Sequence, residues 1–287
     1  MRRFLRLLSK LQWLGLVGLI GVALDIQGLK YLCFFWLLTP IDVFYAFRGM
    51  ADSFKLLFQI LGQLIGIPLT YIRYGFHLPN VKDFHPQCQY SLPFYGEWYV
   101  VNGGIDRMTS HSWTICSQRY AYDFFIVDDT EKSYSGNREN HDSYFCFKRE
   151  ILAPADGIVV EMRDCYPDTP IAGEGQADCA ASDIRGNYIV IKHGEHEFSL
   201  IAHLYQGSIR VKEGDTVARG QVIARCGNSG NTSEPHVHFQ VQTGKSFLLS
   251  AGLPIHFENI GITGSPHQTH GFITKGQYVE NLHLNRQ

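Results

Sequence analysis

The pattern of apolar and polar residues changes near residue 77. Three uncharged, mostly apolar runs precede that point, at residues 11–24, 31–41 and 56–72. A helix that crosses the hydrocarbon core of a bilayer needs about 20 mostly apolar residues. Each run approaches that length when neighbouring apolar residues are added, so residues 1–77 are predicted to form membrane-anchoring helices.

Other interpretations of these runs stay open. A cleaved signal peptide is less favoured, because Asp25, Ile26 and Gln27 follow the first run where small residues would mark a cleavage site. A helical hairpin buried in a soluble protein would need a partner surface to cover it. In the third run, Gly62 and Gly66 form a GxxxG face, which would let another helix approach closely.

The basic residues at the start of the chain predict its orientation. Four cations precede the first run: Arg2, Arg3, Arg6 and Lys10. Cytoplasmic flanks of membrane helices carry an excess of such residues, so the N-terminus is expected in the cytoplasm. Three spans would place the rest of the chain outside, and two would place it inside. We expect a cell-membrane protein with an extracytoplasmic C-terminal domain.

From Leu92 onward, short apolar stretches alternate with turn residues. Gly, Asp, Asn and Pro separate stretches that predict β-strands, at residues 120–127, 157–162, 187–193, 198–204, 221–226 and 237–242. The polar segments 128–149 and 163–183 predict surface loops beside a cleft. The fold class is therefore mainly β, an antiparallel sheet or sandwich preceded by an α-helical transmembrane region.

Composition excludes several classes of function. A net charge of −2 provides no electrostatic case for nucleic-acid binding. The seven cysteines form no CxxC pair, which argues against a thiolate zinc ribbon. The chain contains no GxSxG, P-loop or dinucleotide-binding fingerprint.

Candidate chemistry centres on the segment SEPHVHF, residues 233–239. His236 and His238 are two positions apart on a predicted strand, and side chains alternate between the faces of a strand. Both imidazoles are therefore expected on one face, where they could share one metal ion or a metal-bound water.

Five segments, in this order, resemble the lysostaphin-type zinc metallopeptidases. They are ILAPADGIVVEM (151–162), GNYIVIKHG (186–194), FSLIAHL (198–204), VKEGDTVARGQVIARCGNSGNT (211–232) and SEPHVHF (233–239). The resemblance covers residues 120–242 and implies zinc-dependent cleavage of peptide cross-links in peptidoglycan. The fourth segment alone also resembles a biotinyl or lipoyl carrier hairpin, but the lysine that a carrier modifies is missing from its turn.

The resemblance implies roles for four residues. Asp123 and His238 match metal ligands, His203 matches the catalytic histidine, and His236 matches its partner. A catalytic zinc takes about three protein ligands and keeps an open position for water. A neighbouring histidine can accept the proton of that water and pass it to the leaving amine.

One position departs from the family pattern. The first histidine ligand is expected four residues before Asp123, where the chain has Arg119, which has no lone pair to give. Three interpretations follow: His111 substitutes as the ligand, Gln118 supplies its amide oxygen, or the metal is lost and the domain binds without cutting. His111 is favoured, because it lies in a polar loop just before the ligand strand.

These observations predict four regions. Residues 1–77 anchor the chain, 78–118 form a linker and cleft-bordering loop, 119–265 form the peptidase domain, and 266–287 form a tail. The expected function is zinc metalloendopeptidase, with peptidoglycan and the membrane as partners. One alternative is a metal-free module that binds the cell wall or activates a separate hydrolase. Another is a membrane scaffold or transport accessory whose apolar region carries the function.

Overall fold

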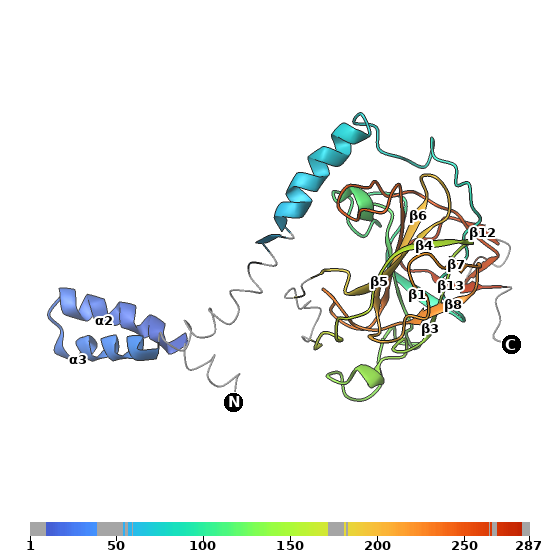
Figure 1. The fold of residues 1–287 in the computed structure, drawn as a ribbon. Coiled ribbons are helices and arrows are strands. Elements are labelled where there is room, and N and C mark those ends of the chain that lie inside the picture. Colours follow the sequence, from blue (N-terminus) through green and yellow to red (C-terminus); the bar gives the residue numbers. More distant parts are fainter. Residues whose placement is uncertain are drawn as a thin grey trace. The chain divides into compact units, whose positions relative to one another are not determined.

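A computed structural model of the 287-residue chain describes residues 10–38, 60–171, 183–263 and 269–282, with the single positions 54, 57, 58, 181 and 265. Its contacts divide the chain into two units, Met1–Leu57 and Phe58–Gln287, and each is considered by itself (Figure 1). Arg2, Arg3 and Arg6, on which the predicted orientation depends, lie outside the described residues, as does the end of the 31–41 run.

Residues 10–38 of the first unit form four short helices. They are η1 (Lys10–Trp13), α2 (Leu14–Ala23), α3 (Gln27–Lys30) and η2 (Tyr31–Leu38). The buried face of α2 is made of Gly15, Gly18 and Gly21, and a side chain at any of them would overlap Trp36, Cys33 or Leu29. Most large apolar side chains of this unit are exposed. Among the described residues, no helix combines the length and the apolar character that crossing a bilayer requires.

The third apolar run forms a helix at residues 60–73, which belongs to the second unit. Its small and polar side packs against a loop of the β domain, where Gly66 lies close to the main chain of Leu248. Thr70 Oγ1 donates to the Leu248 carbonyl at 3.5 Å, and the hydroxyls of Tyr74 and Thr243 are hydrogen-bonded. The glycine face therefore contacts this loop instead of another helix.

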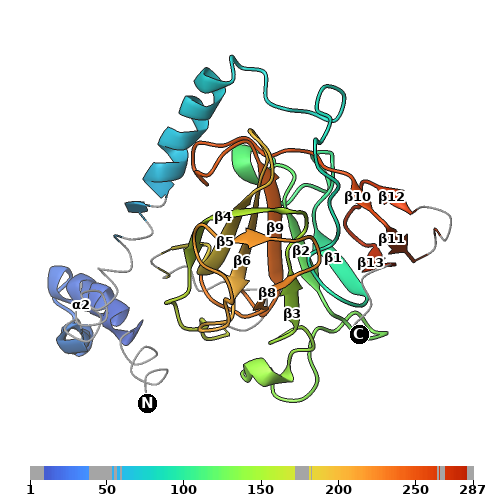
Figure 2. The ribbon, with the colours of Figure 1, turned by 45° about the vertical axis from the view of Figure 1, so that its right-hand side comes forward.

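The second unit is built on a nine-stranded sheet in which all neighbouring strands are antiparallel. Figure 2 shows its central strands side by side. In spatial order the strands are β11 (Ile260–Ile262), β13 (Tyr278–Asn281), β1 (Trp98–Asn102), β2 (Tyr122–Phe125), β9 (Val237–Gln242), β6 (Phe198–Leu204), β5 (Asn187–Lys192), β4 (Gly157–Arg163) and β7 (Thr216–Val217).

Among its described residues, the unit also contains two two-stranded sheets and two single turns of 3-10 helix, besides the helix at 60–73. The sheets are β3 (Glu150–Leu152) with β8 (Val222–Arg225), and β10 (Phe257–Glu258) with β12 (His270–Gly271). The turns are η3 (Cys116–Gln118) and η4 (His141–Ser143). All six strands predicted from the sequence are present, as β2, β4, β5, β6, β8 and β9, and the mainly β, antiparallel class is confirmed. The region boundaries stay predictions, and the sheet also includes β1 and β13, outside residues 119–265.

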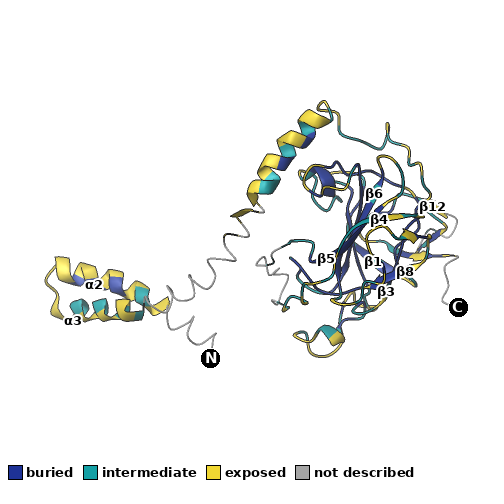
Figure 3. Cartoon of the chain, in the orientation of Figure 1, coloured by how far each residue is buried: buried dark blue, intermediate teal, exposed yellow. Residues whose placement is uncertain are grey.

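The two faces of the central strands differ in chemistry. One face holds the apolar core, to which β2 and β9 contribute Tyr122, Phe124, Val237, Phe239 and Val241. Figure 3 shows β5 and β6, two neighbouring strands of the same sheet, as mostly buried. Full burial of one such side chain contributes about 2 kcal/mol to folding, so the core fixes which face each strand turns inward. The opposite face carries the polar residues of the candidate site.

Candidate metal centre and active site

The pairing of four strands places the candidate ligands in one row. Asp123 on β2 lies opposite His238 on β9, with Asn102 of β1 and Ala202 of β6 as their outer neighbours. Directly opposed residues in an antiparallel pair have Cβ atoms about 5 Å apart, within reach of a shared ion. The sheet therefore positions the carboxylate of Asp123 against the imidazole of His238 without help from a metal.

His111 reaches the same point from the loop that joins β1 to β2. The loop leaves β1 at Gly103, whose φ of +129° and contact with the Tyr122 ring leave no space for a side chain. The hydroxyl of Ser110 donates to the carbonyl of Arg119 at 2.7 Å and so connects the middle of the loop to the end that leads into β2. His111 Nε2 lies 3.1 Å from Asp123 Oδ2, and its ring centre is 4.9 Å from that of His238.

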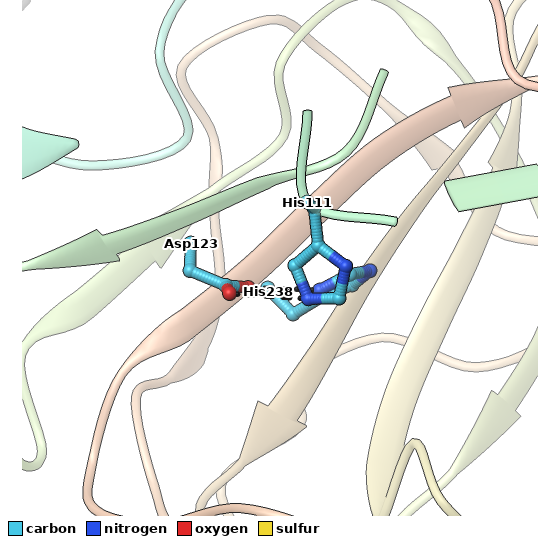
Figure 4. A group of neighbouring side chains, drawn as sticks. All are labelled: His111, Asp123 and His238. Carbon is cyan, nitrogen blue, oxygen red and sulfur yellow. Dashed lines mark hydrogen bonds and ion pairs between the residues drawn. The ribbon is translucent and has the colours of Figure 1, made fainter. Parts of the chain in front are cut away.

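The three side chains point toward one another (Figure 4). Their potential ligand atoms all lie within 4.8 Å of one another, and His238 Nδ1 is 2.9 Å from Asp123 Oδ1. Neighbouring ligands of a tetrahedral zinc ion are about 3.4 Å apart, given metal–ligand distances near 2.1 Å. Two imidazoles and one carboxylate form a donor set typical of catalytic zinc, so these residues fit the ion after small movements.

Arg119 contacts Trp113 and Tyr71 instead of the ligand cluster. Its guanidinium lies over the ring of Trp113 at 4.8 Å, donates to the Trp113 carbonyl at 3.2 Å, and donates to the Tyr71 hydroxyl at 3.0 Å. The residue at the family's ligand position thus binds the loop to the helix at 60–73. Gln118, the other alternative, is buried and lines the cleft beside His111. The cluster geometry favours His111 as the third ligand.

His203 owes its orientation to an irregularity in β6. Ile201 and Leu204 both face the apolar core, which strict alternation would not allow. Between β5 and β6, Asn187 pairs with Leu204 and Ile189 with Ile201, so β6 has one extra residue there, and His203 has a φ of +62°. Such a bulge re-aims a side chain. His203 therefore reaches the polar face, with its ring centre 4.7 Å from that of His236.

Main-chain carbonyls fix the proton positions on the two flanking histidines. His203 Nδ1 lies 2.8 Å from the Ser229 carbonyl, and His236 Nδ1 lies 2.8 Å from the Glu234 carbonyl. A carbonyl only accepts, so each Nδ1 carries the hydrogen and each Nε2 keeps a lone pair. His236 Nε2 is 3.7 Å from Asp123 Oδ1, beside the ligand cluster.

Burial keeps these flanking rings neutral. It is the largest effect on His203 and lowers its pKa well below the usual value, and the neighbouring rings of His236 and His238 lower it further. Burial also lowers the pKa of His236, although Asp123 partly opposes this. Both groups are therefore proton acceptors near neutral pH, as a general base must be.

The loop histidine and the carboxylate behave as an ion pair. Burial opposes the charged form of each. For His111, the charge of Asp123 and its hydrogen bond overcome burial and raise the pKa. For Asp123, the charge of His111 and the hydrogen bond from His111 overcome burial and lower the pKa well below its usual value. The carboxylate is thus ionised and available as a ligand.

A cleft of about 200 Å³ opens beside the cluster. His111, His203 and His238 line it, together with Phe247 and with Gln63 from the helix at 60–73. Substrate that enters this cleft would meet the imidazoles directly, so the helix preceding the β domain contributes to the substrate-facing surface.

The sequence reasoning missed three polar residues around the ligands. Asn102 donates to Asp123 Oδ2 at 3.0 Å, and Gln240 Oε1 lies 2.9 Å from His238 Nε2. Gln242 lies two positions further along β9. The signal for the two glutamines was present in the sequence, because HVHFQVQ continues the polar alternation of the histidine pair for two more steps. Asn102 carries no such signal.

Comparisons with known proteins agree with this architecture. The model of "Peptidase family M23" matches residues 144–248, which include His203, His236 and His238. Peptidoglycan DD-endopeptidase ShyC of Vibrio cholerae is 33% identical over 186 residues, covering 58% of this chain and 42% of ShyC. Murein hydrolase activator NlpD of Salmonella typhimurium is 32% identical over 139 residues, 48% of this chain and 32% of NlpD.

Among solved structures, a zinc-containing peptidase from Vibrio cholerae is 21% identical with a TM-score of 0.35, covering 57% of this chain and 39% of that one. The chain spans less than half the length of either curated relative. With its antiparallel sheet, with His238 on β9 and with His236 directly before that strand, the chain carries a domain of peptidase family M23, the lysostaphin-type peptidases, matched over residues 144–248.

Proposed function

We propose that the chain is a zinc-dependent endopeptidase that hydrolyses peptide cross-links of peptidoglycan. One observation carries this proposal: His111, Asp123 and His238 converge within 4.8 Å, beside a cleft that two of them line. The similarity to a peptidoglycan endopeptidase supports the class of substrate.

Each residue of the site has a distinct role in this proposal. His111, Asp123 and His238 hold the metal, and Asn102 orients the carboxylate of Asp123. Zinc held by these residues would supply a Lewis acid for the scissile carbonyl and a water whose pKa is lowered toward neutrality. His203 and His236 offer the lone pairs of their Nε2 atoms, either of which can accept a proton from the attacking water. The ring that takes the proton then has an Nε2–H, which can donate to the charged oxygen of the tetrahedral intermediate or pass the proton to the leaving amine.

The test uses the purified full-length chain and cross-linked muropeptides. We expect about one zinc per chain by elemental analysis, and cleavage products that disappear on chelation and return with added zinc. A His203→Ala variant should retain zinc and lose most of its turnover, because His203 is not a ligand. Equal turnover by wild type and this variant would contradict the proposed roles.

A second candidate is a metal-free module that binds cell-wall peptide or activates another hydrolase. Two observations favour it: Arg119 occupies the family's ligand position, and the chain is similar to a murein hydrolase activator. Binding of muropeptide without product would support this candidate. Zinc absent from wild type but present in an Arg119→His variant would indicate a decayed site.

We also propose that the chain works at a membrane surface. Along the helix at 60–73, Leu61, Leu64, Ile65, Leu69 and Ile72 are exposed, and positions 60–72 carry no charge. An apolar helix face of this kind suits the boundary between lipid headgroups and acyl chains. The substrate-facing cleft, which Gln63 of the same helix lines, would then stay close to the bilayer.

Co-sedimentation with vesicles of phosphatidylethanolamine and phosphatidylglycerol tests this location. We expect the double variant Leu64→Gln with Ile65→Gln to bind fewer vesicles than wild type. The matched control is Ile158→Gln, because Ile158 is an exposed apolar residue on β4. Equal loss in the control, or no loss in the double variant, would contradict a lipid contact of this helix face.

A further inference from the structure

Two fully buried glutamines extend the polar face of β9 beyond the candidate metal ligand. His238, Gln240 and Gln242 lie at alternate positions and so project from the same face. Gln240 and Gln242 are both 0% exposed. A buried amide is costly unless its donors and acceptors are paired, so such residues need specific partners.

Main-chain carbonyls fix the direction of the hydrogen bonds in this row. The outer end of Gln242 lies 2.7 Å from the Gly244 carbonyl and 3.4 Å from the Lys245 carbonyl. Carbonyls accept only, so this end must be the NH₂ group. The oxygen of Gln242 consequently faces Gln240 and accepts from Gln240 Nε2 at 2.5 Å.

The orientation of Gln240 determines which nitrogen of His238 carries the hydrogen. Because the NH₂ group of Gln240 is turned toward Gln242, its oxygen is turned toward His238 Nε2, at 2.9 Å. An amide oxygen cannot donate, so the hydrogen of this contact belongs to His238 Nε2. A neutral imidazole has one hydrogen, and Nδ1 is therefore left with its lone pair, directed at Asp123.

We propose that Gln240 and Gln242 are positioning residues that hold His238 in its metal-binding tautomer. The inference rests on the proposed metal site. Asp123 Oδ1 by itself would favour a hydrogen on His238 Nδ1, 2.9 Å away, in the place where the metal must bind. The glutamine row, anchored on Gly244 and Lys245, opposes that tautomer by requiring the hydrogen at Nε2.

Loss of Gln242 should weaken this control. Gln240 could then turn its amide by half a rotation and donate to His238 Nε2. The imidazole would place its hydrogen on Nδ1 and donate to Asp123. Metal binding would have to displace that hydrogen, which lowers the affinity. Replacing a residue that orients a metal-ligating histidine typically lowers metal affinity about 10- to 100-fold.

The experiment compares Gln242→Met and Gln240→Met with wild type, using a matched control, Val241→Ala. Val241 lies between the glutamines, is buried, and faces the apolar core. Two readouts are needed: imidazole nitrogen shifts of ¹⁵N-histidine-labelled protein, and zinc affinity from competition with a chelating dye.

Wild type should show a protonated His238 Nε2 with and without zinc. The two glutamine variants should populate the Nδ1-protonated form without metal and bind zinc at least about 10-fold more weakly. The control should bind zinc within about twofold of wild type, because its packing defect leaves the glutamine row intact.

The outcomes separate this inference from the proposed function. Zinc binding by wild type, with equal affinity and an unchanged tautomer in both glutamine variants, would overturn the inference alone. If wild type binds no zinc, the proposed function is wrong. The tautomer of His238 in metal-free protein would still test the inference independently. An unprotonated Nε2 in metal-free wild type refutes it without any variant.

Discussion

The candidate metal centre has two halves that are built differently. Asp123 and His238 face each other across paired strands, with side chains 7% and 5% exposed, whereas His111 comes from a loop and its side chain is 22% exposed. The main-chain hydrogen bonds of the sheet determine the first two positions. The position of His111 depends on side-chain contacts within its loop and on the turn at Gly103. A ligand on a loop can be supplied from a different position more easily than one on a central strand, which explains how Arg119 can occupy the usual ligand position.

The largest effect is expected in the half built on the sheet. Asp123→Asn keeps the shape of the side chain and removes the negative charge that the metal needs. We expect zinc content to fall from about one per chain to near zero, and turnover of muropeptides to fall at least about 1,000-fold. The control is Asp128→Asn, an exposed acid beyond the end of the same strand. Full zinc content in Asp123→Asn would show that the sheet does not supply the ligand.

A smaller effect is expected in the half built on the loop. His111→Ala removes one donor and leaves the pair on the sheet intact. Zinc affinity should fall at least about 100-fold, the upper end of what loss of an outer partner of a ligand costs. The measurement is competition with a chelating dye. Adding Arg119→His to this variant should not restore the affinity, because the side chain at 119 is turned toward Trp113 and Tyr71.

The control for this loss is His196→Ala, which removes an exposed histidine from another loop. Restoration of zinc binding by Arg119→His would mean that the family's ligand position is still available. The third ligand could then be supplied from position 119 as well as from position 111, and the contacts of Arg119 would not prevent this.

The pH dependence of stability should also distinguish the loop ligand His111 from the two flanking histidines, His203 and His236, in metal-free protein. The pKa of His111 is raised by Asp123, so its stabilisation is complete below the usual value of 6.5 and is lost as the pH rises through the raised pKa. Burial lowers the pKa values of His203 and His236, so their contribution is lost as the pH falls below 6.5. These three groups together favour a stability maximum near pH 6.5.

Thermal unfolding of metal-free protein from pH 5 to 9 tests this expectation. The His111→Gln variant should lose the decline on the alkaline side and keep the decline on the acidic side. An unchanged alkaline decline in this variant would show that the pair of His111 and Asp123 does not cause it.

The smallest effect concerns the support of the loop. Tyr71→Phe removes the hydroxyl that accepts from Arg119 and leaves the ring in place. We expect a loss of about 1 kcal/mol in the free energy of unfolding, measured with denaturant, and unchanged zinc affinity. A large loss of zinc affinity would show that this helix contact positions His111.

Local patterns were sufficient to predict much of this domain. Alternating apolar residues predicted six strands, and the spacing of His236 and His238 predicted that both rings lie on one side of the sheet. Both rings do lie beside Asp123, although β9 begins one residue after His236. The glycine face at Gly62 and Gly66 was less informative, because a small-residue face shows that a close approach is possible but does not identify the partner. In the structure, Leu248 is the residue that packs against this face.

The sequence by itself determined six of the strands and the polar face of β9, because side-chain alternation is a property of the local chain. The resemblance to the lysostaphin-type peptidases, and not alternation, made Asp123 and His238 candidate metal ligands. Only the tertiary structure decided two other features of the site. His203 reaches the polar face through a bulge of one residue between β5 and β6, which alternation does not predict. His111 meets Asp123 because the loop returns over the strand, and that path depends on contacts between residues far apart in the chain.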